Sequence, residues 1–214
     1  MTHAARRTAL CAALTAVLTA GCSAAAEEGS NAPERSISAA RSADAWSDQA
    51  KLPAGKTMVG GGDSPCRLPV SFRLAPSWQA HAVDADPVTG GAVRQGPVQL
   101  SCEVDGKPAG RTGFLRVWQG DGTHARQALD TFLAEQSHTA NRQYRSVKAG
   151  TMDAVEVSYA NVSPRLSEHK QERALAVTAS HEIVILHLGG ITTQEHELMV
   201  PALQLARETM AISK

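Results

Sequence analysis

Hydrophobic and polar residues alternate along several short stretches of this chain, and the alternation predicts strands. Every second residue is apolar in segments 70–74 and 98–104, which is typical of strands with one buried face. Asp105-Gly106-Lys107-Pro108 predicts a turn, so segment 113–118 should return beside 98–104 as a hairpin. Segment 79–83 either continues the first strand or forms another, and four more strands are predicted at 144–149, 152–160, 173–179 and 182–188.

Two of the later strands differ in how many of their faces should be buried. In segment 154–159, apolar residues alternate with Glu156 and Ser158, which predicts one face in contact with water. Segment 183–186 is apolar at every position, so this strand is expected at the centre of the sheet. The pair Gly189-Gly190 is expected to end it.

The spacing of apolar residues changes to a helical one after this first group of strands. Apolar residues from Ala125 to Leu133 recur at intervals of three and four, which places them on one face of a helix. We therefore predict a helix at 123–138, with Thr123 or Asp121 as its N-terminal cap.

A second helix is predicted near the C-terminus, where Thr192 and Glu195 have the spacing of a capping box. Pro201 lies inside it, so this helix is expected to kink or to restart with the proline in its first turn. The order of elements is then β-β-β-α-β-β-β-β-α, mostly joined by hairpin-length turns. This order predicts an α+β fold, in which helices pack on an antiparallel sheet.

The N-terminus has the features of an export signal. Arg6 and Arg7 precede an uncharged run, residues 8–20, that is too short to span a bilayer as a permanent helix. The run ends in Leu18-Thr19-Ala20-Gly21-Cys22, which resembles a bacterial lipobox. The resemblance implies that residues 1–21 are a lipoprotein signal peptide and that the Cys22 thiol carries a diacylglycerol. The alternative is an ordinary secretory signal with an incidental cysteine, and Arg6-Arg7 leaves twin-arginine export open.

Lipidation would place the protein on the extracytoplasmic face of the cell membrane, with the membrane itself as a partner. Residues 22–64 are rich in Ala, Ser, Gly and charged residues and show no sustained apolar period, so we expect a flexible tether there. Residues 65–214 are then expected to form a single globular domain.

The composition of the chain restricts the classes of partner that it can bind and the role of its cysteines. The chain has 214 residues, with 21 Lys and Arg against 21 Asp and Glu, so it has no basic excess that would favour nucleic acid. Beyond the signal peptide and Cys22, only Cys66 and Cys102 remain, and an exported protein usually oxidises such a pair. We expect an inward-facing disulfide between adjacent strands or strand ends, since a redox pair would favour the Cys-x-x-Cys spacing that is absent.

The segment Phe72-Arg73-Leu74-Ala75-Pro76-Ser77-Trp78, followed by a hairpin, a helix, four strands and a final helix, resembles the PsbP-like superfamily of photosystem-II extrinsic proteins. Within it, the chain is most similar to the LpqN-type actinobacterial lipoproteins, over residues 65–214. The resemblance implies an α/β/α sandwich that binds partners and carries no catalytic residues. Trp78 is expected to cover the core rather than to contact a ligand.

Fragments of catalytic motifs are present but incomplete. Gly55-Lys56-Thr57 lacks the preceding glycine and strand of a phosphate-binding loop. Gly62-Asp63-Ser64 resembles the nucleophile block of GDSL hydrolases, without the Asp-x-x-His that accompanies it. His181-Glu182 lacks the second histidine of a zinc protease, because position 185 is isoleucine. The remaining histidines are too widely spaced for one metal ion, and most are expected at the surface or the rim of the domain.

These observations favour a non-catalytic binding or scaffolding module at the cell envelope, with an envelope protein or a lipid as its partner and with no cofactor. The alternative is a carrier of an apolar small molecule or lipid, held between helix 123–138 and the sheet. A hydrolase that uses Ser64 or a histidine such as His187 is a third hypothesis. Arg142, Arg145 and Lys148 are expected on a solvated strand face, with anionic lipid as an alternative contact.

Overall fold

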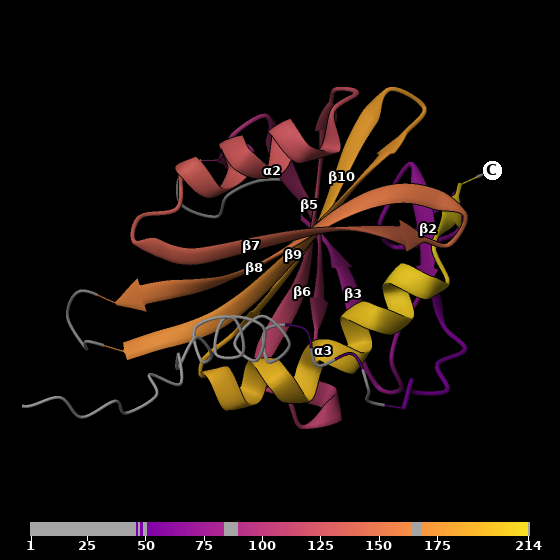
Figure 1. Ribbon diagram of the computed structural model, residues 1–214. Helices are drawn as coiled ribbons and strands as arrows, with labels where there is room; N and C mark the ends of the chain where they lie inside the picture. The colour runs from indigo at the N-terminus through magenta and orange to yellow at the C-terminus, as the bar shows by residue number, and fades with distance from the viewer. Residues whose placement is uncertain (1–45, 47, 49–50, 84–89, 164–167, 214) are drawn as a thin grey trace, which may run out of the picture.

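A large antiparallel sheet dominates the computed structural model, which describes Trp46, Asp48 and residues 51–83, 90–163 and 168–213. Its strands run in the order β3-β5-β6-β10-β9-β8-β7, with β4 paired to β5 (Figure 1). Their bounds are Gln79–Ala82 for β3, Arg94–Gln95 for β4, Val98–Asp105 for β5, Gly113–Asp121 for β6, Thr139–Ala149 for β7, Met152–Ser163 for β8, Glu168–Ala179 for β9 and Glu182–Gly190 for β10. A short 3₁₀ turn, η1 (Lys107–Ala109), lies between β5 and β6.

Strand β10 lies at the centre of the sheet, as its apolar sequence predicted. It pairs with β6 on one side and β9 on the other. Ile183 and Ile185 belong to one buried cluster, whereas Val184 and Leu186 belong to another. Because neighbouring residues of a strand point to opposite faces, the sheet has a hydrophobic core on each side.

Helix α2 (Ala125–Ala134) covers one of these two faces. Leu129, Phe132 and Leu133 are fully buried there, and the Phe132 ring meets Trp118 edge-on at 5.4 Å between centroids. The helix is shorter than predicted, and the expected caps are wrong: His124 occupies the N-cap position without a side-chain hydrogen bond. The Thr123 hydroxyl instead lies 3.0 Å from His124 Nδ1.

Helix α3 (Thr193–Glu208) covers the opposite face together with a small sheet of order β1-β2-β11. The small sheet consists of β1 (Met58–Val59), β2 (Val70–Arg73) and β11 (Ala211–Ile212). Thr192 accepts a hydrogen bond from the Glu195 backbone N–H at 3.2 Å, which confirms Thr192 as the cap. The helix continues through Pro201 without a restart. With a helix on each face of the main sheet, the expected α/β/α sandwich is confirmed.

The folded domain begins earlier in the chain than residue 65. Val59 is fully buried and pairs with Phe72, so segment 51–64 is part of the fold rather than tether. Gly55 packs so closely on the Leu74 carbonyl that an added Cβ would lie 1.7 Å from its oxygen. Contacts with β2 and α3 bury this segment. It has no regular apolar face of its own, so its sequence did not indicate that it belongs to the domain. The predicted signal peptide and Cys22 lie outside the described residues.

A disulfide joins Cys66 to Cys102, with 5.7 Å between their Cα atoms, and both residues are fully buried. Cys102 belongs to β5 in the large sheet, whereas Cys66 precedes β2 in the small one. Because Cys102 lies within β5 and Cys66 lies outside the strands, the expected placement on adjacent strands or strand ends is wrong, although the bridge faces inward as expected. It ties together the two layers of the core that contains Trp78, which is buried as the sequence suggested.

Candidate functional site

A pocket of about 410 Å³ opens on the sheet face that carries α2, beyond the part that the helix covers. We refer to it as the sheet-face pocket. Its floor includes Phe114 and Gly189, which are paired across β6 and β10. One wall is the β5–β6 turn with Lys107 and Arg111, and Ile191 closes the opposite side. Its volume lies in the range of small-molecule sites.

Glycines keep the floor of the pocket hollow. Gly189 and Gly190 are the last two residues of β10, which confirms the expectation that this pair ends the strand. A Cβ on Gly189 would point toward Glu172 and His187, at 3.8 Å from each side chain. Because Gly189 has no side chain, no side chain from this cross-strand position packs against Phe114, and both residues line the pocket.

Positive charge is concentrated at the rim of the pocket. Within the described parts of the chain, the side chains of Lys107 and Arg111 make no hydrogen bond or ion pair. By contrast, Arg116 pairs with Glu103 at 2.7 Å, and its guanidinium lies over the Phe114 ring. The pocket thus combines an apolar floor with two cations that are available to a ligand.

A buried polar cluster of Tyr159, Glu172 and His187 lies behind the pocket. Glu172 Oε2 accepts a hydrogen bond from the Tyr159 hydroxyl at 2.9 Å, and His187 Nε2 lies 3.1 Å from the same oxygen. His187 Nε2 is also 2.9 Å from the Tyr159 oxygen. On its other side, Glu172 Oε1 pairs with Lys170 at 2.6 Å. Glu172 is therefore held by three groups from β8, β9 and β10, and it also lines the pocket.

The protonation of this cluster follows from its surroundings. Burial alone would raise the pKa of Glu172, but the bonds from His187 and Lys170 outweigh it and lower that pKa to about 2. Burial and the Glu172 charge raise the pKa of Tyr159 well above its ordinary value. At neutral pH, Glu172 is therefore charged and Tyr159 keeps its proton.

The structure separates the residues of the hydrolase hypothesis. Ser64 Oγ accepts hydrogen bonds from the backbone N–H groups of Gly60 and Cys66, in the turn beside the small sheet. His187 belongs to the opposite face of the large sheet, where its ring lies 5.5 Å from that of Phe132. Ser64 and His187 therefore do not form a nucleophile and base pair.

Two of the histidines are buried rather than at the surface. His187 is 6% exposed and His196, in α3, is 2% exposed. Burial, assisted by the nearby Arg173 charge, lowers the pKa of His196 to about 3, so its ring stays neutral. In the described ranges, no three residues of the types His, Cys, Asp and Glu come together as a metal site would require.

The carrier hypothesis placed its ligand between helix 123–138 and the sheet, where the structure has a smaller hollow of about 210 Å³ near the start of α2, lined by Gln127, Ala128 and Ile183 among others. Leu129, Phe132 and Leu133 fill that interface and are fully buried. The sheet-face pocket lies on the same side of the sheet, beyond the helix. The sequence predicted only a turn at residues 105–108, part of the loop that forms one wall of this pocket. A pocket also depends on which side chains are absent from a surface, and sequence spacing does not show this.

The expected solvated face of Arg142, Arg145 and Lys148 is confirmed for Arg142 and Lys148, which are exposed, but is wrong for Arg145. Arg142 donates to the Leu133 carbonyl under α2, whereas Arg145 bonds Glu156 on the α3 face. Residues three apart on a strand point to opposite faces, which separates the two arginines. Lys148 pairs with Asp153 at the solvent-exposed end of β7.

Comparison with known proteins defines the class. A family model described as an uncharacterised lipoprotein matches residues 36–210, and the chain belongs to this lipoprotein family. No curated protein matches the sequence. Among the described residues, no helix has the length and apolar character needed to cross a bilayer.

Two solved structures are similar to this one. The solution structure of cyanobacterial PsbP (CyanoP) from Synechocystis is 10% identical, with a TM-score of 0.48, and the match covers 74% of this chain and 93% of that one. The crystal structure of LpqN, involved in cell envelope biogenesis of Mycobacterium tuberculosis, is 14% identical, with a TM-score of 0.38, and the match covers 74% and 90%. These are the two groups that the sequence resemblance names.

Proposed function

We propose that this member of the lipoprotein family is a lipid-anchored binding module of the cell envelope, and that its domain holds a small anionic amphiphile in the sheet-face pocket. One observation carries the proposal: the cations Lys107 and Arg111 line the same pocket as the apolar side chains of Phe114 and Ile191. A ligand with an acidic head and an apolar body would satisfy both parts of the pocket. Membership of the family supports the envelope location.

The buried cluster behind the pocket favours binding over catalysis. The Tyr159 hydroxyl and His187 both contact Glu172 Oε2, and Lys170 pairs with Glu172 Oε1, so both carboxylate oxygens already have partners. A general base needs a pKa near the working pH, whereas that of Glu172 is lowered to about 2. We infer that the cluster fixes the floor of the pocket and that the domain binds its ligand without transforming it.

Binding of the anionic, apolar dye 8-anilinonaphthalene-1-sulfonate to the full chain tests the pocket. We expect the Lys107→Glu, Arg111→Glu double variant to raise the Kd of the dye at least ~10-fold, equivalent to about 1.4 kcal/mol, because the variant replaces rim attraction by repulsion. Fluorescence titration at constant ionic strength measures this Kd.

Lys56→Glu is a matched control, since Lys56 is an exposed cation outside the residues that line the pocket. It should leave the Kd unchanged. Equal affinity of the double variant and the unmodified protein, with unchanged circular dichroism, would show that the pocket does not bind the anion.

The lipid anchor has a separate test. We expect intact mass spectrometry of the protein from its native membrane to show an N-terminal Cys22 that carries a diacylglycerol, and Cys22→Ser to move the protein into the soluble fraction. Recovery of an intact Met1 or of an unmodified Cys22 thiol would contradict the anchor and leave the pocket proposal standing.

A further inference from the structure

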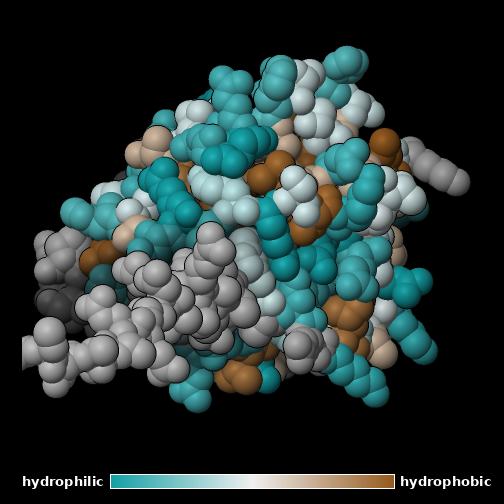
Figure 2. Space-filling model, in the orientation of Figure 1, coloured by the Kyte–Doolittle hydropathy of each residue, from teal (hydrophilic) through white to brown (hydrophobic). Residues whose placement is uncertain are grey.

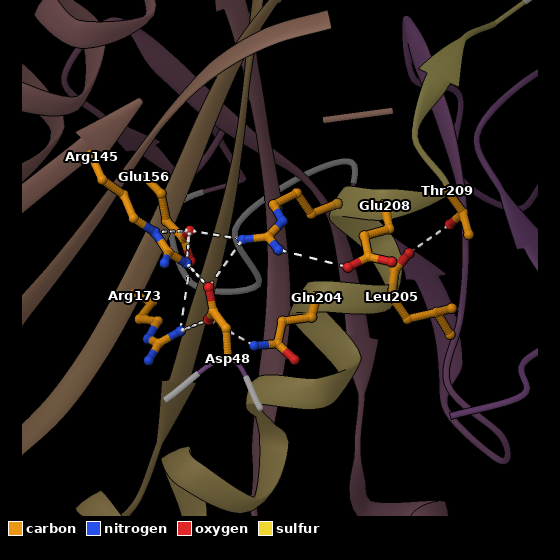
Figure 3. Close-up of polar contacts among 9 residues, drawn as sticks. Asp48, Arg145, Glu156, Arg173, Gln204, Leu205, Glu208 and Thr209 are labelled. Carbon is orange, nitrogen blue, oxygen red and sulfur yellow. Dashed lines mark hydrogen bonds and ion pairs between the residues drawn. The ribbon is translucent and has the colours of Figure 1, made fainter. Parts of the chain in front are cut away.

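Three arginines from different elements converge on the α3 face of the large sheet. Arg145 comes from β7, Arg173 from β9 and Arg207 from α3, and we refer to them as the arginine cradle (Figure 3). Glu156, on β8, lies among them: its Oε2 is 2.6 Å from Arg145 and 3.2 Å from Arg207, and its Oε1 is 3.8 Å from Arg173. The strand face of Glu156, predicted to be in contact with water, is in fact buried, and the Glu156 side chain is 1% exposed.

A second carboxylate enters the cradle from a distant part of the chain. Asp48 Oδ2 lies 2.5 Å from Arg145 and 3.7 Å from Arg207, and Oδ1 lies 3.2 Å from Arg173. Gln204 Nε2 donates to Oδ1 at 2.7 Å. Asp48 belongs to no helix or strand, so side-chain contacts position it.

An aromatic ring accompanies this carboxylate. The Arg145 guanidinium lies 4.0 Å from the centroid of the Trp46 ring, and that of Arg173 lies 5.3 Å from it. Cation–π contacts of this kind add to the attraction of the carboxylate for the same arginines. The arginine cradle therefore binds two groups of the same segment, the indole of Trp46 and the carboxylate of Asp48 two residues later.

Charge explains why the cradle needs an anion. Asp48 pairs with all three guanidinium groups, which also face Glu156 and, at Arg207, Glu208, so loss of Asp48 removes one of the carboxylates that compensate a largely buried positive cluster. Burial tends to raise the pKa of Asp48, but the charge and hydrogen bonds of Arg145, with Gln204 and Arg173, outweigh it and lower that pKa. A charged carboxylate is thus the form that the cradle binds.

The cradle is also open to a ligand from solution. Asp48, Arg145 and Arg207 line a hollow of about 490 Å³, whose lining also includes Lys148 and the acidic residue Glu208. Asp48 itself remains 28% exposed. The coloured part of the surface in Figure 2 is mostly hydrophilic, with hydrophobic residues in separate spots.

We propose that the arginine cradle is a carboxylate-binding site that the chain fills with its own Asp48, and that an acidic peptide with a tryptophan two residues before its carboxylate binds there in competition. The proposal is independent of the sheet-face pocket, which lies on the other face of the sheet. Because Asp48 is tethered to the domain, its high effective concentration keeps a competing peptide out of the unmodified protein. Removing the Asp48 charge should therefore expose the site.

The test uses the full chain with Asp48→Asn and the blocked peptide Ala-Trp-Ser-Asp-Gln, the sequence of residues 45–49. Isothermal titration calorimetry should show binding to the variant at least ~10-fold tighter than to the unmodified protein. A peptide with asparagine in place of its aspartate should lose this binding, and so should the protein variant Asp48→Asn, Arg145→Ala.

Trp46→Ala provides a second variant that keeps Asp48 and weakens its hold, and it should bind the peptide with intermediate affinity. Circular dichroism checks that each variant is folded. Absence of binding to both variants at ~1 mM peptide, equal binding of the aspartate and asparagine peptides, or equal binding by the unmodified protein would each overturn the proposal.

Discussion

Glu156→Gln should lower the free energy of unfolding by about 3 kcal/mol. The substitution keeps the shape of the side chain but removes its charge, so the three arginines lose the most deeply buried carboxylate that faces them. Removing one partner of a buried ion pair leaves uncompensated charge, which typically costs about 3–5 kcal/mol. We take the lower end because the Arg145 side chain remains 24% exposed. Urea denaturation followed by circular dichroism measures the change.

Asp153→Asn is a matched control from the same strand. Asp153 pairs with Lys148 at 2.6 Å, but its side chain is 93% exposed. Water screens such a pair, so the control should change the stability by less than about 0.5 kcal/mol. Similar losses for Glu156→Gln and Asp153→Asn would mean that burial of the cluster has no energetic importance.

Loss of the disulfide should have a comparable or larger effect. We expect Cys66→Ala, Cys102→Ala to lower the free energy of unfolding by about 4 kcal/mol, because the bridge closes a loop with a sequence separation of 36 residues. Alanine avoids placing an unpaired hydroxyl in a fully buried position. Thermal and urea unfolding of the two proteins measure the difference.

A reductant separates the bridge from the substitutions themselves. Dithiothreitol should destabilise the unmodified protein by a similar amount and leave the double variant unchanged. A reductant effect of the same size on both proteins, or on neither, would mean that the bridge does not contribute to stability. The cavity left by two missing sulfur atoms should add a smaller loss that is present in both conditions.

Local sequence patterns predicted the helices and strands whose buried residues recur at regular intervals. The apolar run at 183–186 indicated the central strand, because only a strand with neighbours on both sides buries every residue. The Thr192 cap was visible because capping depends on residues within one turn. The cap of α2 could not be found in this way, because His124 occupies the N-cap position without a side-chain hydrogen bond. Packing of Phe132 and Leu133 on the sheet stabilises this helix instead.

Glu156 shows where a local pattern is insufficient. Alternation along β8 marked it correctly as polar within a strand, but a polar position can face water or a buried partner. Its partners come from β7, β9 and α3, and sequence spacing does not reveal that they meet. The same holds for Tyr159 and Glu172, which act with His187 only because three strands align.

The sequence alone determined the α+β class and the central strand, and it predicts the export signal with Cys22 as the lipidated residue. Each depends on residues that are close together in the chain, or on composition. Tertiary structure alone decided that Asp48 enters the arginine cradle, that the glycines of β10 leave a pocket, and that segment 51–64 belongs to the domain. These features arise where distant segments meet, and burial and charge compensation there depend on both partners at once.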